Sequence, residues 1–130
     1  MFSFKIISSL LASVFLGVLF LQSGIDKISD RKGNLEWLQK HFSNSMFRNV
    51  VPMLLLVLTL FELATGLTCF SGIILLTISG NALLAKAGAL LSGITILMLF
   101  TGQRLAKDYA GAASLVGYFI LSLMALYFAF

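Results

Sequence analysis

Four apolar stretches, separated by polar connections, constrain the fold of this chain more than any other feature. They cover about residues 6–25, 50–79, 82–101 and 110–129. A helix needs roughly 20 apolar residues to cross a bilayer, and each stretch meets that length. The 130 residues leave no room for a further domain. The sequence therefore predicts one all-α domain, a polytopic bundle of four transmembrane helices in the lipid bilayer.

Composition agrees with a membrane location. Apolar residues make up 59% of the chain and charged residues 11%, against about 45–50% and about 25% in soluble domains. The net charge of +4 would suit nucleic acid in a soluble protein. Here the basic residues flank the apolar stretches and no aromatic-basic surface pattern accompanies them, so we expect no nucleic-acid partner.

The first connection, residues 26–49, is the only long one, and its second half is amphipathic. Asn34 stands where an N-cap belongs, and apolar side chains follow at helical spacing: Leu35, Leu38 and Phe42. This pattern predicts a short interfacial helix that places the single tryptophan at headgroup depth, although an ordinary connector helix fits equally well. The second connection is a tight turn predicted at Ser79-Gly80-Asn81, because Gly and Asn tolerate the left-handed conformation.

Four spans place both termini on one side of the membrane and the connections 26–49 and 102–109 on the other. All the lysines and arginines lie in or beside these two connections except Lys5 and Lys86. Positive residues stay preferentially on the cytoplasmic side. We therefore predict a multi-pass protein of the plasma or inner membrane, with both connections in the cytoplasm and both termini outside.

Small residues at four-residue spacing predict how the helices pack. Lipid tails are as apolar as leucine, so helices associate through close packing and hydrogen bonds. We interpret the pattern as packing within one bundle and leave homo-oligomerisation open. The residues are Ser9, Ser13 and Gly17; Ala85, Gly88, Ala89, Ser92 and Gly93; and Ala113 and Gly117.

Glu62 is the one carboxylate far from a connection, about 18 Å along its helix from residue 50. A carboxylate at that depth is costly, so we expect it to face the bundle interior and to be protonated or paired. Thr65, Gly66 and Cys69 follow on the same face. Such a residue favours a ligand, proton or substrate contact over the alternative, a structural hydrogen bond between helices.

Two polar segments on the predicted cytoplasmic side complete a candidate site. They are residues 22–27 and residues 103–109, and Lys27 or Arg104 would reach inward toward the carboxylate because long basic side chains cross several ångströms of depth. The alternative is that both anchor helix ends at the headgroups. The candidate pocket residues are Glu62, Lys27, Ser23, Thr65, Gln103 and Arg104, and the sequence identifies no catalytic residue.

The chain has little equipment for chemistry of its own. The single cysteine, Cys69, excludes a disulfide or redox pair within one chain and is interpreted as a packing residue. The single histidine, His41, excludes a bis-histidine haem and is expected at the surface. No metal-ligand spacing or dinucleotide fingerprint occurs. We expect no intrinsic cofactor, no metal site and no enzymatic activity by the chain alone.

Two motifs resemble the DoxX-like family of small four-helix membrane proteins. They are Phe20-Leu21-Gln22-Ser23-Gly24-Ile25-Asp26-Lys27-Ile28 at the end of the first span and Phe61-Glu62-Leu63-Ala64-Thr65-Gly66 in the second. The layout matches over nearly the whole chain. Some relatives belong to a quinone-linked thiosulfate oxidoreductase, a terminal oxidase complex or an assembly coupled to oxidative-stress defence.

The resemblance implies an accessory subunit of a quinone-linked membrane redox system, with a quinone as cofactor and redox-complex subunits as partners. Two alternatives stay open on the residues alone. One is a non-enzymatic binder or carrier of a small molecule or lipid, in which Glu62 is the gating or proton-linked group. The other is a structural subunit of a membrane complex.

Overall fold

The computed structural model describes residues 3–45 and 47–130 of the chain. No strand occurs among the described residues. Four helical segments within them are long and apolar enough to cross a membrane, namely Phe4–Ser29, Arg48–Ser79, Leu83–Leu105 and Tyr109–Ala129. The predicted fold class is confirmed, because the chain is an all-α polytopic bundle.

Helix α1 (Phe4–Ser29) forms the first span and extends one turn past its predicted end. Its first turn is capped by Ser3, whose hydroxyl accepts a hydrogen bond from the backbone N–H of Ile6. At the other end the polar residues stay helical because neither proline nor a left-handed glycine interrupts them. Lys27 therefore lies within the last turn of α1, and the helix determines the face on which its side chain leaves the backbone.

Helix α2 (Arg31–His41) follows at once and occupies the first connection. The prediction of Asn34 as its N-cap is wrong, since Asp30 caps it by accepting a hydrogen bond from the backbone N–H of Gly33. The Asn34 amide donates instead to the carbonyl oxygen of Asp30, at 2.8 Å. Asp and Asn are equally good caps, and the helix begins at the earlier of the two.

Helix α3 (Val51–Ser79) begins after a short 3-10 turn at Arg48–Val50. Pro52 lies in its first turn, where the missing N–H has no helical partner to lose. Gly80 ends the helix with φ +72°, and the predicted turn is confirmed. Helix α4 (Leu83–Leu105) then runs back along α3.

The fourth span consists of two helices, α5 (Tyr109–Ser114) and α6 (Val116–Ala129). Asp108 caps α5 by accepting a hydrogen bond from the backbone N–H of Gly111 at 2.9 Å. At Leu115 the backbone N–H bonds to a carbonyl only three residues back, which tightens the turn and separates the two helices. The predicted span is present as an interrupted helix.

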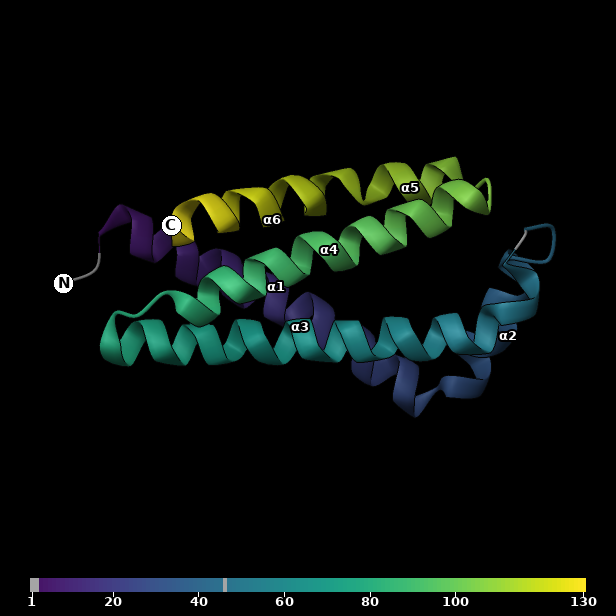
Figure 1. Ribbon diagram of the computed structural model, residues 1–130, viewed down its shortest axis with the longest axis horizontal. Coiled ribbons are helices and arrows are strands. Elements are labelled where there is room, and N and C mark those ends of the chain that lie inside the picture. The colour runs from purple at the N-terminus through teal and green to yellow at the C-terminus, as the bar shows by residue number, and fades with distance from the viewer. Residues whose placement is uncertain (1–2, 46) are drawn as a thin grey trace.

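The four spans form a closed bundle. Contacts join α1 with α3, α3 with α4, α4 with α6, and α6 with α1. Both termini lie at one end of the bundle, and α2 and the connection between α4 and α5 lie at the other (Figure 1). This grouping of termini and connections agrees with the sequence analysis and puts all the predicted site residues from the connections at one end.

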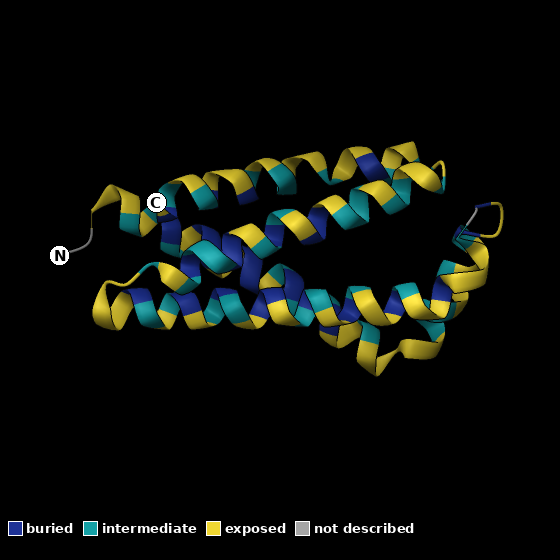
Figure 2. Cartoon of the chain, viewed as in Figure 1, coloured by how far each residue is buried: buried dark blue, intermediate teal, exposed yellow. Residues whose placement is uncertain are grey.

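Glycine allows the closest helix contacts. A Cβ atom at Gly66 would lie 2.8 Å from the backbone nitrogen of Leu21, and one at Gly72 would lie 2.7 Å from the backbone nitrogen of Ala85. A side chain at either position would push two backbones apart, so α3 approaches α1 and α4 this closely only because glycine stands there. Buried residues follow these inner faces, whereas exposed residues cover the outside (Figure 2).

The predicted small-residue faces are correct in two spans and wrong in the last. Most of those in α1 and α4 are buried, but Ala113 and Gly117 are exposed. Both sides of this span are apolar, because one meets lipid and the other meets protein, so the pattern did not distinguish them. The small residues that α5 and α6 turn inward are Ala112, Ser122, Ala125 and Ala129.

Candidate functional site

An ion pair lies inside the bundle between α1 and α3. Nζ of Lys27 is 3.1 Å from Oε1 of Glu62 and donates a hydrogen bond of 3.2 Å to Oε2. Nζ also donates to the hydroxyl of Ser23 at 2.9 Å. The Glu62 side chain is 0% exposed and the Lys27 side chain 14% exposed. Three of the six candidate residues are therefore in direct contact, and we call Lys27 and Glu62 the buried ion pair.

Local sequence explains why these groups meet. Ser23 precedes Lys27 by four residues and so lies one turn away on the same face of α1. Between them, Gly24 packs directly against Leu63 of α3, where a Cβ atom would lie 2.7 Å from a leucine methyl carbon. This close approach brings the ends of the lysine and glutamate side chains within hydrogen-bonding distance across the helix interface.

The carboxylate is only partly satisfied. Oε1 of Glu62 is close to the ammonium group but outside hydrogen-bonding geometry, and it has no hydrogen-bond partner among the described residues. The expected partner of the carboxylate is thus Lys27. Because two opposite charges stand together, the buried site carries no net charge.

Thr65 lies one turn further along α3 and belongs to a different contact. Its hydroxyl is 3.0 Å from that of Thr95 on α4 and donates to the carbonyl of Phe61. Cys69 follows on the same face, with Sγ 3.8 Å from the hydroxyl of Ser92. The face predicted to turn inward is buried throughout, and beyond Glu62 it serves as a hydrogen-bonded seam between α3 and α4.

Gln103 is tied to α2 rather than to the buried ion pair. Its carbonyl Oε1 accepts a hydrogen bond of 2.7 Å from Nε2 of His41. The same nitrogen is 3.7 Å from Oδ2 of Asp108, and the imidazole stacks on Trp37 with ring centroids 4.5 Å apart. His41 was expected at the surface, but its side chain is only 16% exposed, because α2 folds back and holds it against the end of α4.

Arg104 does not reach toward Glu62. Its side chain leaves the last turn of α4 on the outer side, and its guanidinium carbon lies 4.5 Å from the ring centroid of Tyr109. The two residues flank the turn that leads into α5, so the ring is the nearest surface on which the cation can lie. Of the two basic residues proposed for the site, only Lys27 reaches it.

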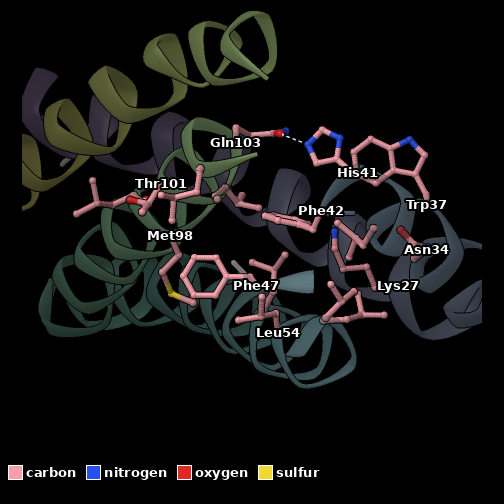
Figure 3. Close-up of a pocket in the computed structure, with 18 of the residues that line it drawn as sticks. Lys27, Asn34, Trp37, His41, Phe42, Phe47, Leu54, Met98, Thr101 and Gln103 are labelled. Atoms are coloured by element: carbon pink, nitrogen blue, oxygen red, sulfur yellow. Dashed lines mark hydrogen bonds between the residues drawn. The ribbon is translucent and has the colours of Figure 1, made fainter. Parts of the chain in front are cut away.

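A pocket of about 640 Å³ lies beside the buried ion pair, between α2, the first half of α3 and the second half of α4. Its walls are mostly apolar, and Figure 3 shows Met98, Phe47 and Leu54 on one side of it. Ile94 and Leu97 belong both to the pocket wall and to the exposed surface, as does Trp37 of α2, so the pocket is open along the side of α4 as well as beside α2.

Thr101 lies on the side of Met98, whereas most polar groups of the lining occupy the opposite side of this pocket (Figure 3). Lys27, Asn34 and His41 lie there, and Gln103 stands nearby with its hydrogen bond to His41 (Figure 3). Of the candidate residues, Lys27 and Gln103 line the pocket, whereas Glu62 lies behind Lys27 and is not part of the wall. Lys27 is therefore the link between the pocket and the buried ion pair.

The aromatic residues of the pocket were not predicted as site residues. Trp37, Phe42 and Phe47 all line it. The signal was present, since Leu38 and Phe42 belong to the apolar face predicted for the amphipathic helix. That face turns toward protein and covers the pocket, instead of only lying on the membrane surface.

No group of His, Cys, Asp and Glu side chains that would hold a metal ion occurs among residues 3–45 and 47–130. The chain matches no family model, no curated protein and no solved structure. The resemblance to the DoxX-like family thus stays a prediction that rests on the two motifs around Lys27 and Glu62. The structure gives those motifs a shared place, because they meet in the buried ion pair.

Proposed function

We propose that the chain is a DoxX-like integral membrane protein that binds a lipid-soluble ring compound of the quinone class in the pocket between α2, α3 and α4. The observation that carries this proposal is the pocket itself. Its volume of about 640 Å³ falls within the range of about 300–1,000 Å³ that is usual for small-molecule sites. A mostly apolar wall with a few polar groups on one side suits an amphipathic ring compound.

The lining supports a quinone in particular. Trp37, Phe42 and Phe47 offer aromatic surface for a flat ring. Hydrogen-bond donors for ring carbonyl oxygens come from the Lys27 ammonium group and the side-chain amide of Gln103, whose carbonyl oxygen alone is bonded to His41. The sideways opening gives an isoprenoid tail a route into the surrounding lipid.

The small number of potential redox residues in the chain supports a role as an accessory subunit. One cysteine and one histidine provide neither a redox pair nor a bis-histidine haem, so electrons would reach the bound quinone from a partner subunit. The resemblance to DoxX-like proteins, some of which belong to membrane redox systems, supports a partner of this kind. The positive-inside rule supports a cytoplasmic location for the α2 end, and hence for the pocket.

The test is purification in mild detergent followed by mass spectrometry of lipid-soluble compounds that stay bound. Leu58→Trp fills the pocket, and Leu60→Trp, two residues along the same helix at an exposed position, is the matched control. We expect a quinone in the wild type and in L60W and its loss in L58W. Equal quinone contents in L58W and L60W, or none in the wild type, would overturn the proposal.

A wild type without bound ligand but with stable partner proteins would favour the structural-subunit alternative. Co-purified proteins are therefore identified in the same three preparations. The accessory-subunit proposal expects subunits of a membrane redox complex, at equal levels in all three preparations, because neither substitution lies on a surface that the proposal assigns to a partner.

A further inference from the structure

Lys27 lines the pocket and is also one partner of the buried ion pair. The charges of the ion pair therefore act on any ligand that binds in the pocket. Among the described residues that line the pocket, Lys27 is the one lysine, arginine, aspartate or glutamate. Building on the proposed function of the pocket, we propose that the buried ion pair makes the site selective for neutral carbonyl compounds and excludes carboxylate amphiphiles such as fatty acids.

The hydrogen bonds of Lys27 leave a donor for the ligand. An ammonium group has three N–H donors. One is used by the hydroxyl of Ser23 and one by Oε2 of Glu62. The third serves an acceptor in the pocket, and a ketone or quinone oxygen accepts it without bringing any charge. Such a ligand leaves the contacts of the ion pair intact.

The charges reject a carboxylate. Glu62 lies directly behind Lys27, 3.1 Å from Nζ and fully buried, so the lysine charge is already compensated. A ligand carboxylate bound to Nζ would put two negative charges on one ammonium group, and one of these charges, on Glu62, is shielded from solvent by complete burial. The Glu62 carboxylate and a ligand carboxylate on the same ammonium group would repel each other strongly in a low-dielectric environment. The glutamate therefore acts as a counter-selecting group.

This selectivity matters in a membrane. Fatty acids and other anionic amphiphiles share the bilayer with quinones and have similar apolar tails. A lone buried lysine beside an apolar pocket would attract them. Pairing that lysine with Glu62 keeps its hydrogen-bonding capacity and removes its attraction for anions. The two shared motifs that carry Ser23, Lys27 and Glu62 thereby determine which lipid-soluble compounds enter.

The experiment uses the purified protein in phosphatidylcholine nanodiscs and the fluorescence of Trp37, the only tryptophan and a residue of the pocket wall. Decylubiquinone is the probe, because a bound quinone quenches indole fluorescence. Two competitors then displace it: methyl undecyl ketone and dodecanoate, at a mildly alkaline pH at which dodecanoate is ionised. They have the same tail and differ in whether the carbonyl carries a charge.

In the wild type we expect the ketone to displace the quinone at least about tenfold more effectively than dodecanoate. In Glu62→Gln the lysine charge is uncompensated, and the preference should reverse in favour of dodecanoate. In the double variant Lys27→Gln, Glu62→Gln the ketone should again be preferred, because an amide pair attracts no anion. This double variant is the control for effects of the glutamine side chain itself.

The outcomes separate the two proposals. No saturable quenching of the wild type by decylubiquinone would overturn the quinone proposal for the pocket. Quenching that dodecanoate and the ketone reverse equally well would leave the pocket function standing and overturn the charge selectivity. That comparison uses the wild type alone, so it decides the matter even where Glu62→Gln fails to fold.

Discussion

The spacing between α3 and α4 differs between the two ends of the bundle. Near the termini, α3 and α4 meet backbone to backbone where Gly72 faces Ala85. Toward α2 the two helices diverge (Figure 1), and large side chains such as Leu58 and Met98 leave the pocket between them. Small residues thus give a tight end with little freedom. Large residues give an open end in which the space between helices is available to a ligand.

The buried ion pair lies between the tight end and the open end of the bundle. It joins α1 to α3 just where the pocket begins. In the tight end the helices are held by close packing and by hydrogen bonds between uncharged side chains. At the boundary they are held by two charges, whose contribution depends on both partners being present. The substitutions below test this difference, beginning with the largest expected effect.

Lys27→Met should destabilise the bundle most, by about 3–5 kcal/mol, because it leaves the Glu62 carboxylate buried without a partner. The free energy of unfolding is measured by titrating the protein in mixed micelles with sodium dodecyl sulfate. In the double variant Lys27→Met, Glu62→Met most of the loss should be recovered, since no buried charge remains. A single variant as stable as the wild type would show that the carboxylate is not held as a charged group.

Leu16→Ala should cost about 3 kcal/mol in the same titration, because Leu16 is 0% exposed within the packed core and leaves a cavity there. The comparison is Met98→Ala at the open end, where the side chain already borders empty space. We expect about 1 kcal/mol or less for this change. Equal losses for the two variants would contradict the contrast between a tight and an open end.

Gly72→Ala should cost about 2 kcal/mol, since the new Cβ atom meets the backbone of α4, which cannot move aside as a side chain would. Gly117→Ala is the control, because no atom lies within 4 Å of its Cβ position. It should be neutral or stabilise by up to about 1 kcal/mol through helix propensity. The midpoints of thermal unfolding, followed by circular dichroism, rank the two variants. A lower midpoint for Gly117→Ala than for Gly72→Ala would contradict the close approach of α3 and α4 at Gly72.

His41→Ala should have the smallest effect on stability, about 1 kcal/mol, because it removes one hydrogen bond to Gln103 and the stacking on Trp37. Its main result should be local. We expect faster hydrogen exchange of the α2 backbone with unchanged exchange in α3. Lys40→Ala, one residue earlier and exposed, is the control. Exchange that rises equally in both variants would show that His41 does not fasten α2 to α4.

Much of the fold was predictable because membrane spans have simple requirements. Length and hydropathy located all four spans, and the turn at Gly80 followed from the chemistry of a left-handed residue. The helix α1 continues to Ser29, one turn beyond the apolar stretch, because polar residues can continue a helix. Lys27 lies in that extra turn, which holds its side chain on the face of α1 that meets α3.

The site was only half predictable for a physical reason. Burial of Glu62 and its need for a partner follow from electrostatics alone, and Lys27 was one of two partners considered. The pocket did not follow, because an apolar side chain that lines a cavity and one that faces lipid give the same pattern. Leu58 illustrates this: it lies one turn before Glu62 and so on the inward face of α3, but nothing in the sequence tells that it lines a cavity instead of packing against a neighbouring helix.

The sideways opening at Ile94 and Leu97 has a consequence for how binding is quantified. A ligand that enters between helices comes from the bilayer, where it is concentrated by partitioning, and never has to leave the lipid phase. The relevant variable is then its mole fraction in the membrane rather than its concentration in water. Diluting the ligand with extra lipid should weaken occupancy, whereas changing the aqueous volume at constant lipid should hardly affect it.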